Sequence, residues 1–149
     1  MSIGVDLLWW VAPIASVFAL VVAFFLFRKM KASPQGNDRM REIAQYVREG
    51  AFAYLRRQYR VVTIVFGAMF LLLAGLAFMG VQNPFVPVAF LTGGFFSGLC
   101  GFIGMNAATL ASNRTAEGCR HSLNRGLQVA FRSGAVMGLV VVGFGLLDI

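Results

Sequence analysis

Four long apolar runs constrain this 149-residue chain more than any other feature. They cover residues 7–27, 61–80, 88–110 and 127–147. A helix needs about 20 consecutive apolar residues to cross the hydrocarbon core of a bilayer, and each run has roughly that length. Composition agrees, because 58% of the residues are hydrophobic and only 13% are charged. We therefore predict an all-α integral membrane protein with four transmembrane helices.

The basic residues all lie on one side of these predicted spans. Residues 28–60 hold nine Lys or Arg against three acids, and residues 112–132 hold four Arg against one acid. The connection at 81–87 is uncharged, and its two prolines indicate a tight, non-helical turn. Asp6 precedes the first run and Arg28, Lys29 and Lys31 follow it, a charge order typical of an uncleaved first span. The positive-inside rule therefore predicts that segments 28–60 and 111–126 are cytoplasmic and that the N-terminus is outside.

An amphipathic helix is predicted within the first cytoplasmic segment. Its apolar residues recur at helical spacing opposite charged ones, at Met40, Ile43, Ala44, Val47, Ala51, Tyr54 and Leu55. Pro34 and Gly36 interrupt the chain before it, and Asp38 is the expected cap. No breaker follows, so we favour a rod of roughly 60 Å that continues into the second span. The alternative is a helix lying flat against anionic headgroups.

Small residues recur every three or four positions along the third run. They are Gly93, Gly94, Ser97, Gly98, Gly101, Gly104, Ala107, Ala108 and Ala111. Such a face allows another helix to approach closely, so bulky replacements of Gly98 and Gly101 are expected to break a helix contact. The fourth run repeats the pattern with Gly134 and Gly138, followed by Gly143 and Gly145. Close packing within a larger helical bundle explains these residues better than a ligand role.

No residue of the chain is assigned a catalytic, cofactor-binding or metal-binding role. Ionisable groups inside the bilayer mark ion paths, and none is expected at mid-membrane depth. Arg132 is the deepest charge and can extend to the inner interface. The six acids have no paired spacing suited to a divalent metal, and no glycine-rich phosphate loop is followed by Lys. Four arginines of the inner segments could bind phosphate, but lipid headgroups would satisfy the same positive charges. They are Arg114, Arg120, Arg125 and Arg132.

The remaining polar residues have structural interpretations. His121 is expected in a basic loop without a neighbouring acid. Cys100 and Cys119 are expected to be small buried or semi-buried residues. The inner end of the third span has polar residues expected to bond across helices, at Asn106, Thr109 and Asn113.

Two stretches of the inner regions resemble the membrane-bound, ion-translocating inorganic pyrophosphatases. The first is Met40-Arg41-Glu42-Ile43-Ala44, Arg48-Glu49-Gly50-Ala51 and Ala53-Tyr54-Leu55-Arg56-Arg57-Gln58-Tyr59. The second is Gly101-Phe102-Ile103-Gly104-Met105, Ala108-Thr109, Asn113-Arg114-Thr115-Ala116, Leu123-Asn124 and Val129 to Gly138. The resemblance covers nearly the whole chain. Gly118, Cys119 and His121 differ from the family pattern, which more often has small residues such as Ala, Ser or Gly there. These positions are expected to lie in a loop.

The resemblance implies that this chain is the N-terminal portion of a much longer pump. Members have about sixteen spans, and the first four, which this chain resembles, belong to an outer, supporting ring of a multi-span bundle. The implied function is coupling of cytosolic pyrophosphate hydrolysis to outward H+ or Na+ transport, with Mg2+ as cofactor. Catalytic residues, metal ligands, the choice of ion and any K+ dependence belong to later spans, so this chain alone should be inactive. Implied partners are membrane lipids, the remaining spans and a second copy of the full-length protein, without nucleic acid, in the cell (inner) membrane.

A different class of function is the main alternative. Four spans and a basic inner face also suit a stand-alone membrane scaffold or assembly subunit without catalysis. A stable, defined oligomer of the isolated chain would favour that alternative, because glycine-lined faces exposed to lipid otherwise mispair. A small dimeric exporter would need a membrane-embedded carboxylate, which the sequence lacks.

Overall fold

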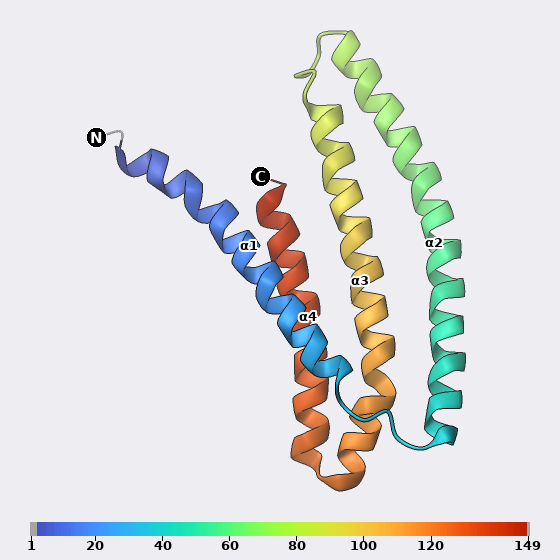
Figure 1. The fold of residues 1–149 in the computed structure, drawn as a ribbon. Helices are drawn as coiled ribbons and strands as arrows, with labels where there is room; N and C mark the ends of the chain where they lie inside the picture. Colours follow the sequence, from blue (N-terminus) through green and yellow to red (C-terminus); the bar gives the residue numbers. More distant parts are fainter. Residues whose placement is uncertain (1–2, 149) are drawn as a thin grey trace.

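The computed structural model describes the backbone of residues 3–148 and the side chains of residues 10–148. That part of the chain forms four helices, α1 (Ile3–Lys31), α2 (Asp38–Phe78), α3 (Val86–His121) and α4 (Leu123–Leu147), and no strand (Figure 1). All four helices are long and apolar enough to cross a membrane. The predicted all-α membrane fold is therefore confirmed. The side chain of Asp6, which entered the charge argument, lies outside the described residues.

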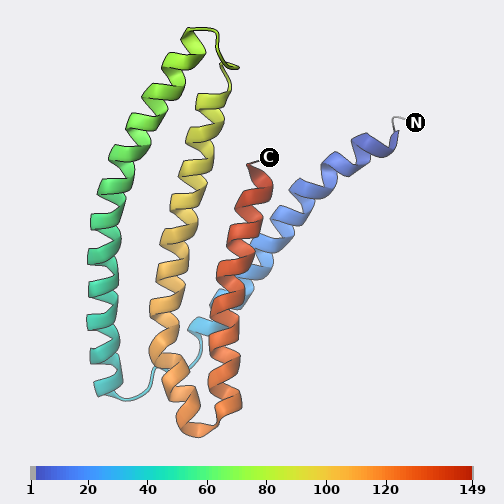
Figure 2. The same cartoon turned by 180° about the vertical axis from the view of Figure 1, so that it is seen from behind.

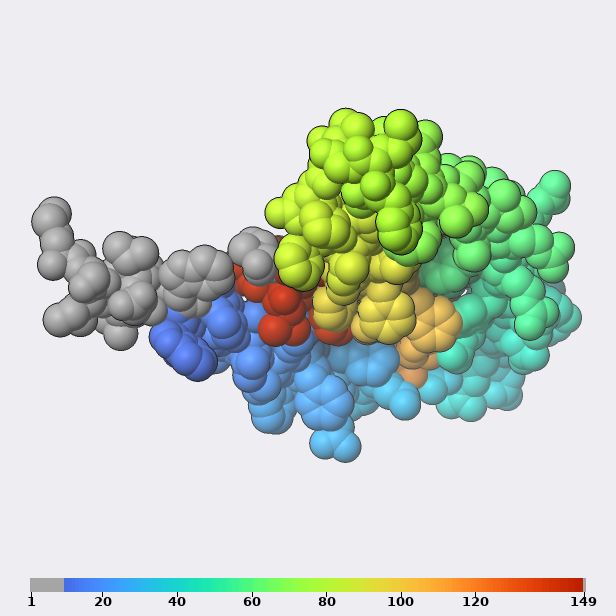
Figure 3. Space-filling model, turned by 90° about the horizontal axis from the view of Figure 1, so that it is seen from above, coloured from blue at the N-terminus to red at the C-terminus, as the bar shows by residue number. Residues whose placement is uncertain are grey.

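The helices do not pack in chain order. α4 lies between α1 and α3, and α2 contacts α3 alone among the other helices of the described chain (Figures 1 and 2). Viewed from the end that holds the α2–α3 connection, α1 and α2 lie on opposite sides of the bundle (Figure 3). The opposite end holds segment 32–37 and the α3–α4 turn, where the basic residues gather. One face of α2 is therefore without a helical partner in this part of the protein.

The long rod predicted from the amphipathic segment is present. α2 runs unbroken for 41 residues, roughly 60 Å at about 1.5 Å per residue. Its cap differs from the prediction, because the N-cap is Asn37 and not Asp38. Asn37 has extended backbone, and its Oδ1 accepts a hydrogen bond from the Met40 amide at 2.9 Å. Asp38 is instead the first residue of the helix.

The segment 111–126, predicted as a cytoplasmic connection, is almost entirely helical. α3 continues to His121, and Ser122 alone separates it from α4. Ser122 is extended, and its hydroxyl accepts a hydrogen bond from the Arg125 amide at 3.2 Å, which caps α4. Gly118, Cys119 and His121 are therefore helical and not loop residues. The helix extends beyond the apolar run because nothing between Ala111 and His121 interrupts it.

The α2–α3 connection is slightly shifted from its predicted range. It covers residues 79–85, so Pro87 stands in the first turn of α3 and not in the connection. Proline is tolerated there because the first turn has unpaired amides in any case. Gly80 has φ +73°, a left-handed conformation that favours glycine, and Asn83 Oδ1 accepts a hydrogen bond from the Phe85 amide at 3.0 Å.

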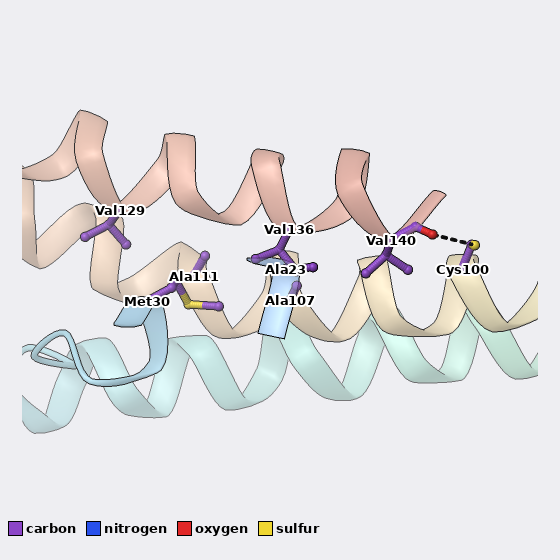
Figure 4. Packing of buried hydrophobic residues seen from close by; sticks show 8 residues of the cluster. All are labelled: Ala23, Met30, Cys100, Ala107, Ala111, Val129, Val136 and Val140. Carbon is purple, nitrogen blue, oxygen red and sulfur yellow. Dashed lines mark hydrogen bonds between the residues drawn. The ribbon is translucent and has the colours of Figure 1, made fainter. Parts of the chain in front are cut away.

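The core lies between α1, α3 and α4. Its buried residues are mostly small, and Figure 4 shows them interleaved, at Ala23, Met30, Cys100, Ala107, Ala111, Val129, Val136 and Val140. Where α1 crosses α4, the buried Ser16 hydroxyl donates to the Gly143 carbonyl at 2.6 Å. A Cβ on Gly143 would lie 2.8 Å from Leu20, so glycine permits this close approach. Small residues hold the helices together because lipid removes the hydrophobic drive for association.

Gly118 is expected to be irreplaceable at the α3–α4 turn. A Cβ there would lie 2.9 Å from the Gly126 amide nitrogen, and backbone cannot rotate away. Gly118→Ala should therefore lower the free energy of unfolding by about 1–3 kcal/mol, measured by thermal unfolding in detergent. Gly134→Ala is the matched control, because a Cβ at Gly134 meets no atom within 4 Å of it in the described structure. Alanine favours helix over glycine, so the control should be neutral or stabilising, and equal losses in both variants would contradict the packing argument.

Candidate functional site: a basic pocket in the α2–α3 groove

A groove runs between α2 and α3 and follows one face of α2. On α2 this face recurs at helical spacing, at Arg41, Gln45, Arg48, Leu55, Tyr59, Val62 and Phe66. The groove has two parts, a mainly apolar cavity of about 860 Å³ and a polar cavity of about 370 Å³ toward the start of α2. We call the smaller cavity the basic pocket. Its lining is Gln35, Arg41, Ala44, Gln45, Arg48, Thr109, Leu110, Asn113 and Arg114.

Arg114 is the buried charge of the basic pocket. Only 3% of this residue is exposed, yet no carboxylate of the described chain lies within 4 Å of its guanidinium. Its Nε donates to the Lys31 carbonyl at the end of α1, at 3.3 Å, and its Nη1 donates to the Leu110 carbonyl. The last carbonyls of a helix lack partners within the helix and carry partial negative charge. Arg114 therefore caps α1, while its full positive charge has no counter-charge in this part of the protein.

Asn113, the neighbour of Arg114, fixes the loop that leads into α2. Its Nδ2 donates to the Gln35 carbonyl at 2.9 Å. Two consecutive residues of α3 thus hold the end of α1 and the 32–37 segment at the same time. Because α2 contacts neither α1 nor α4 among the described residues, this loop and α3 together determine where α2 begins.

Arg48 and Arg41 complete the basic pocket from α2. Arg48 Nη2 donates to Asn106 Oδ1 at 3.2 Å, and its guanidinium lies over the Phe52 ring, 5.6 Å from the centroid. Arg41 faces Asp38 at 3.8 Å, but the Asp38 side chain is fully exposed to solvent, so this pair contributes little. The lining residues hold three guanidinium groups and no carboxylate. The pocket therefore offers hydrogen-bond donors and positive charge, which suit an anion.

The apolar part of the groove lies over small residues of α3. The Phe66 ring covers Gly94, where a Cβ would lie 2.1 Å from the ring, and it stacks on Phe90. The Tyr59 hydroxyl donates to the Gly98 carbonyl, and a Cβ on Gly101 would lie 3.0 Å from the same hydroxyl. The close helix approach expected at Gly101 is thus present. At Gly98 a Cβ meets no described atom within 4 Å, so Gly98 borders open space in the groove.

The polar residues expected to bond across helices divide into two kinds. Asn106 accepts from Arg48 of α2, and Asn113 donates to the 32–37 segment, so both form contacts between elements. The expectation is wrong for Thr109, whose hydroxyl donates to the Met105 and Asn106 carbonyls of its own helix. A buried threonine in a helix commonly bonds the preceding turn in this way.

His121 and Cys119 also differ from their sequence interpretations. His121 Nε2 lies 3.1 Å from Glu117 Oε1, because helix α3 places these residues one turn apart. Arg120 Nη1 lies 3.1 Å from the other oxygen of Glu117. His121 therefore has an acid neighbour. Cys100 is buried as expected, whereas Cys119 is exposed near the α3–α4 turn.

The described residues do not fit a metal centre. They include no group of three or more His, Cys, Asp or Glu side chains that could hold an ion. The assignment of no catalytic or metal-binding residue to this chain stays a prediction. What sequence reasoning missed is the burial of Arg114, because its partners are main-chain carbonyls that leave no sequence pattern. The one signal in the sequence that could have pointed to Arg114 is that Asn113 and Arg114 belong to the second stretch that resembles the pyrophosphatase family.

Comparisons with known proteins find a matching family and several relatives of this chain. The profile of the family described as "Inorganic H+ pyrophosphatase" matches residues 17–149. A Bacteroides thetaiotaomicron protein, whose name describes a K(+)-stimulated pyrophosphate-energized sodium pump, is 55% identical over 97% of this chain. The "K(+)-insensitive pyrophosphate-energized proton pump 2" of Moorella thermoacetica is 40% identical over 93%, and a Methanosarcina mazei proton pump is 38% identical over 91%. The chain spans 20% of the length of each of these relatives.

Loss of the Arg114 guanidinium is expected to release the α1–α2 loop. Arg114→Met keeps most of the side-chain volume but leaves the Lys31 and Leu110 carbonyls without this donor, which should cost about 1.5–3 kcal/mol. Limited trypsin digestion in detergent should then cut faster after Lys31. Arg125→Met is the control, because Arg125 is exposed at the start of α4. Unchanged cleavage in Arg114→Met would contradict the capping role.

Proposed function

Because this chain belongs to the inorganic H+ pyrophosphatase family, we propose that it forms the N-terminal, supporting part of a membrane pump. The complete pump would couple hydrolysis of cytosolic pyrophosphate to outward transport of H+ or Na+. Two observations carry this proposal. The family profile matches residues 17–149, and the chain spans only 20% of the length of the relatives named above. Mg2+ and pyrophosphate would bind residues outside this chain, since the described residues do not fit a metal centre. This chain's own contribution is helix packing.

Several helix surfaces support the proposal because they suit further helices. The apolar stretch of α2 has no buried residue, although α2 is the longest helix. On α4, Gly134 and Gly138 are exposed one turn apart, and a Cβ at either position meets no described atom within 4 Å. Paired glycines four residues apart allow two membrane helices to approach closely. The remaining spans of the pump, and a second copy of it, are the proposed partners of these surfaces.

The location and orientation are part of the same proposal. The protein would be a multi-pass protein of the cell membrane, with segments 28–60 and 111–126 on the cytoplasmic side and the N-terminus outside. The gathering of basic residues at the end that holds segment 32–37 supports this orientation. At that end, lysine and arginine meet anionic headgroups, and the uncharged 79–85 connection lies at the other end of the bundle.

A chimera tests the proposed function. The region of the Bacteroides thetaiotaomicron pump that matches this chain is replaced by the chain itself. The chimera should hydrolyse pyrophosphate and transport its ion at rates comparable to the parent, whereas the 149-residue chain alone should do neither. Gly134→Leu with Gly138→Leu in the chimera should reduce the amount of folded pump, because leucine prevents close helix contact. A chimera that folds and inserts but is inactive would favour the stand-alone scaffold.

Labelling of Cys119 tests the orientation with a native residue. Cys119 is exposed and Cys100 is buried, so one thiol should react with a membrane-impermeant maleimide. Inverted membrane vesicles should be labelled and right-side-out vesicles should not, because the α3–α4 turn is assigned to the cytoplasmic side. Cys119→Ser should abolish the signal. Labelling of right-side-out vesicles alone would reverse the proposed orientation.

A further inference from the structure

The α2–α3 groove combines features that match one class of ligand. The basic pocket holds Arg41, Arg48 and Arg114, and the apolar part of the groove follows it along the same face of α2, from Leu55 to Phe66. On α3 the lining residues follow one another along the chain, with Met105 and Ala108 in the apolar part and Thr109 and Asn113 in the basic pocket. We propose that the groove binds one anionic phospholipid, with the phosphate in the basic pocket and an acyl chain along the apolar part.

Charge balance is the first argument for this ligand. The buried Arg114 guanidinium has no carboxylate within 4 Å in the described chain, and no acid lines the basic pocket. A buried charge without a counter-charge is costly, so an anion that enters the pocket relieves that cost. Main-chain carbonyls accept from Nε and Nη1 of Arg114, but they supply only partial charges. Arg41 and Arg48, which are more exposed, would complete the phosphate contacts from α2.

The apolar part of the groove decides between a lipid and a free anion. It is lined by side chains such as Leu55, Val62, Phe66 and Met105, with Gly98 leaving open space. Its polar groups are few, and Tyr59 already donates to the Gly98 carbonyl. Inorganic phosphate would leave this surface uncovered, whereas an acyl chain would bury it. The basic pocket is lined by Gln35 of segment 32–37 and Arg41 near the start of α2, at the end of the bundle that is proposed to face the cytoplasmic headgroups.

The experiment uses the purified 149-residue chain and native mass spectrometry from detergent. The probes are palmitoyl-oleoyl phosphatidylglycerol (POPG), phosphatidylcholine with the same acyl chains (POPC), and inorganic phosphate. We expect one retained POPG per chain and much less POPC. Arg41→Gln with Arg48→Gln should lower POPG retention by about tenfold or more, since each basic residue near an anionic lipid contributes about a factor of five. Arg114 is left intact because it also caps α1.

Matched variants separate this site from general attraction to a basic surface. Arg57→Gln with Arg60→Gln removes the same charge from exposed positions of α2 that do not line the groove. This control should retain POPG like the unaltered chain. Gly98→Leu should fill the open space in the apolar part and weaken POPG retention. Circular dichroism confirms that each variant keeps its helical content, so a loss of binding is not a loss of fold.

Four results would overturn the proposal. They are equal retention of POPG and POPC, equal loss in both arginine pairs, unchanged POPG retention in Gly98→Leu, and displacement of POPG by millimolar inorganic phosphate. The last result would indicate a free-anion site. The chimeric pump gives a further outcome, because POPG bound to the chain but absent from the pump would mean that another protein segment fills the groove. None of these results bears on the pump assignment, which the activity of the chimera tests separately.

Discussion

The buried guanidinium of Arg114 is the interaction on which the arrangement of the other elements depends. It ties the end of α1 to α3 through the Lys31 carbonyl, next to the fully buried Met30. Asn113 beside it holds the loop into α2. Because α2 contacts neither α1 nor α4 in the part of the chain that the structure describes, this attachment and α3 set the position of the α2 rod, and therefore the shape of the groove. One charged residue thus links helix capping, topology and the candidate site.

Small residues determine how closely the remaining helices approach α3. Gly104 faces Met137 of α4, whereas Gly94 and Gly101 face the aromatic residues of α2. α3 therefore packs against α4 and against α2. Because close packing on two sides leaves little room for side chains, α3 has many small residues. In lipid, helix association relies on such close contact and on hydrogen bonds between helices. The hydrogen bonds between helices include those from Ser16 of α1 to Gly143 of α4 and from Tyr59 of α2 to Gly98 of α3.

Length and periodicity were sufficient to predict four long apolar helices and the α2 rod from sequence, because both depend on local properties. Sequence reasoning misses the helical extension to His121 because the end of an apolar run marks the limit of a predicted span and not the end of the helix. Without that extension, the contact between Glu117 and His121 could not be predicted. The basic pocket was also beyond local reasoning. Its arginines come from α2 and α3, and the groove exists only once the two helices pack.

The account treats this chain as the supporting part of a longer pump, and its gene offers the most direct test. The measurement is to sequence the source DNA downstream of the Ile149 codon and read several hundred further codons. We expect the reading frame to continue into additional spans rich in Asp and Lys, which would supply the metal and pyrophosphate ligands. A stop codon immediately after Ile149 would contradict the account and would leave a stand-alone membrane scaffold or a gene remnant.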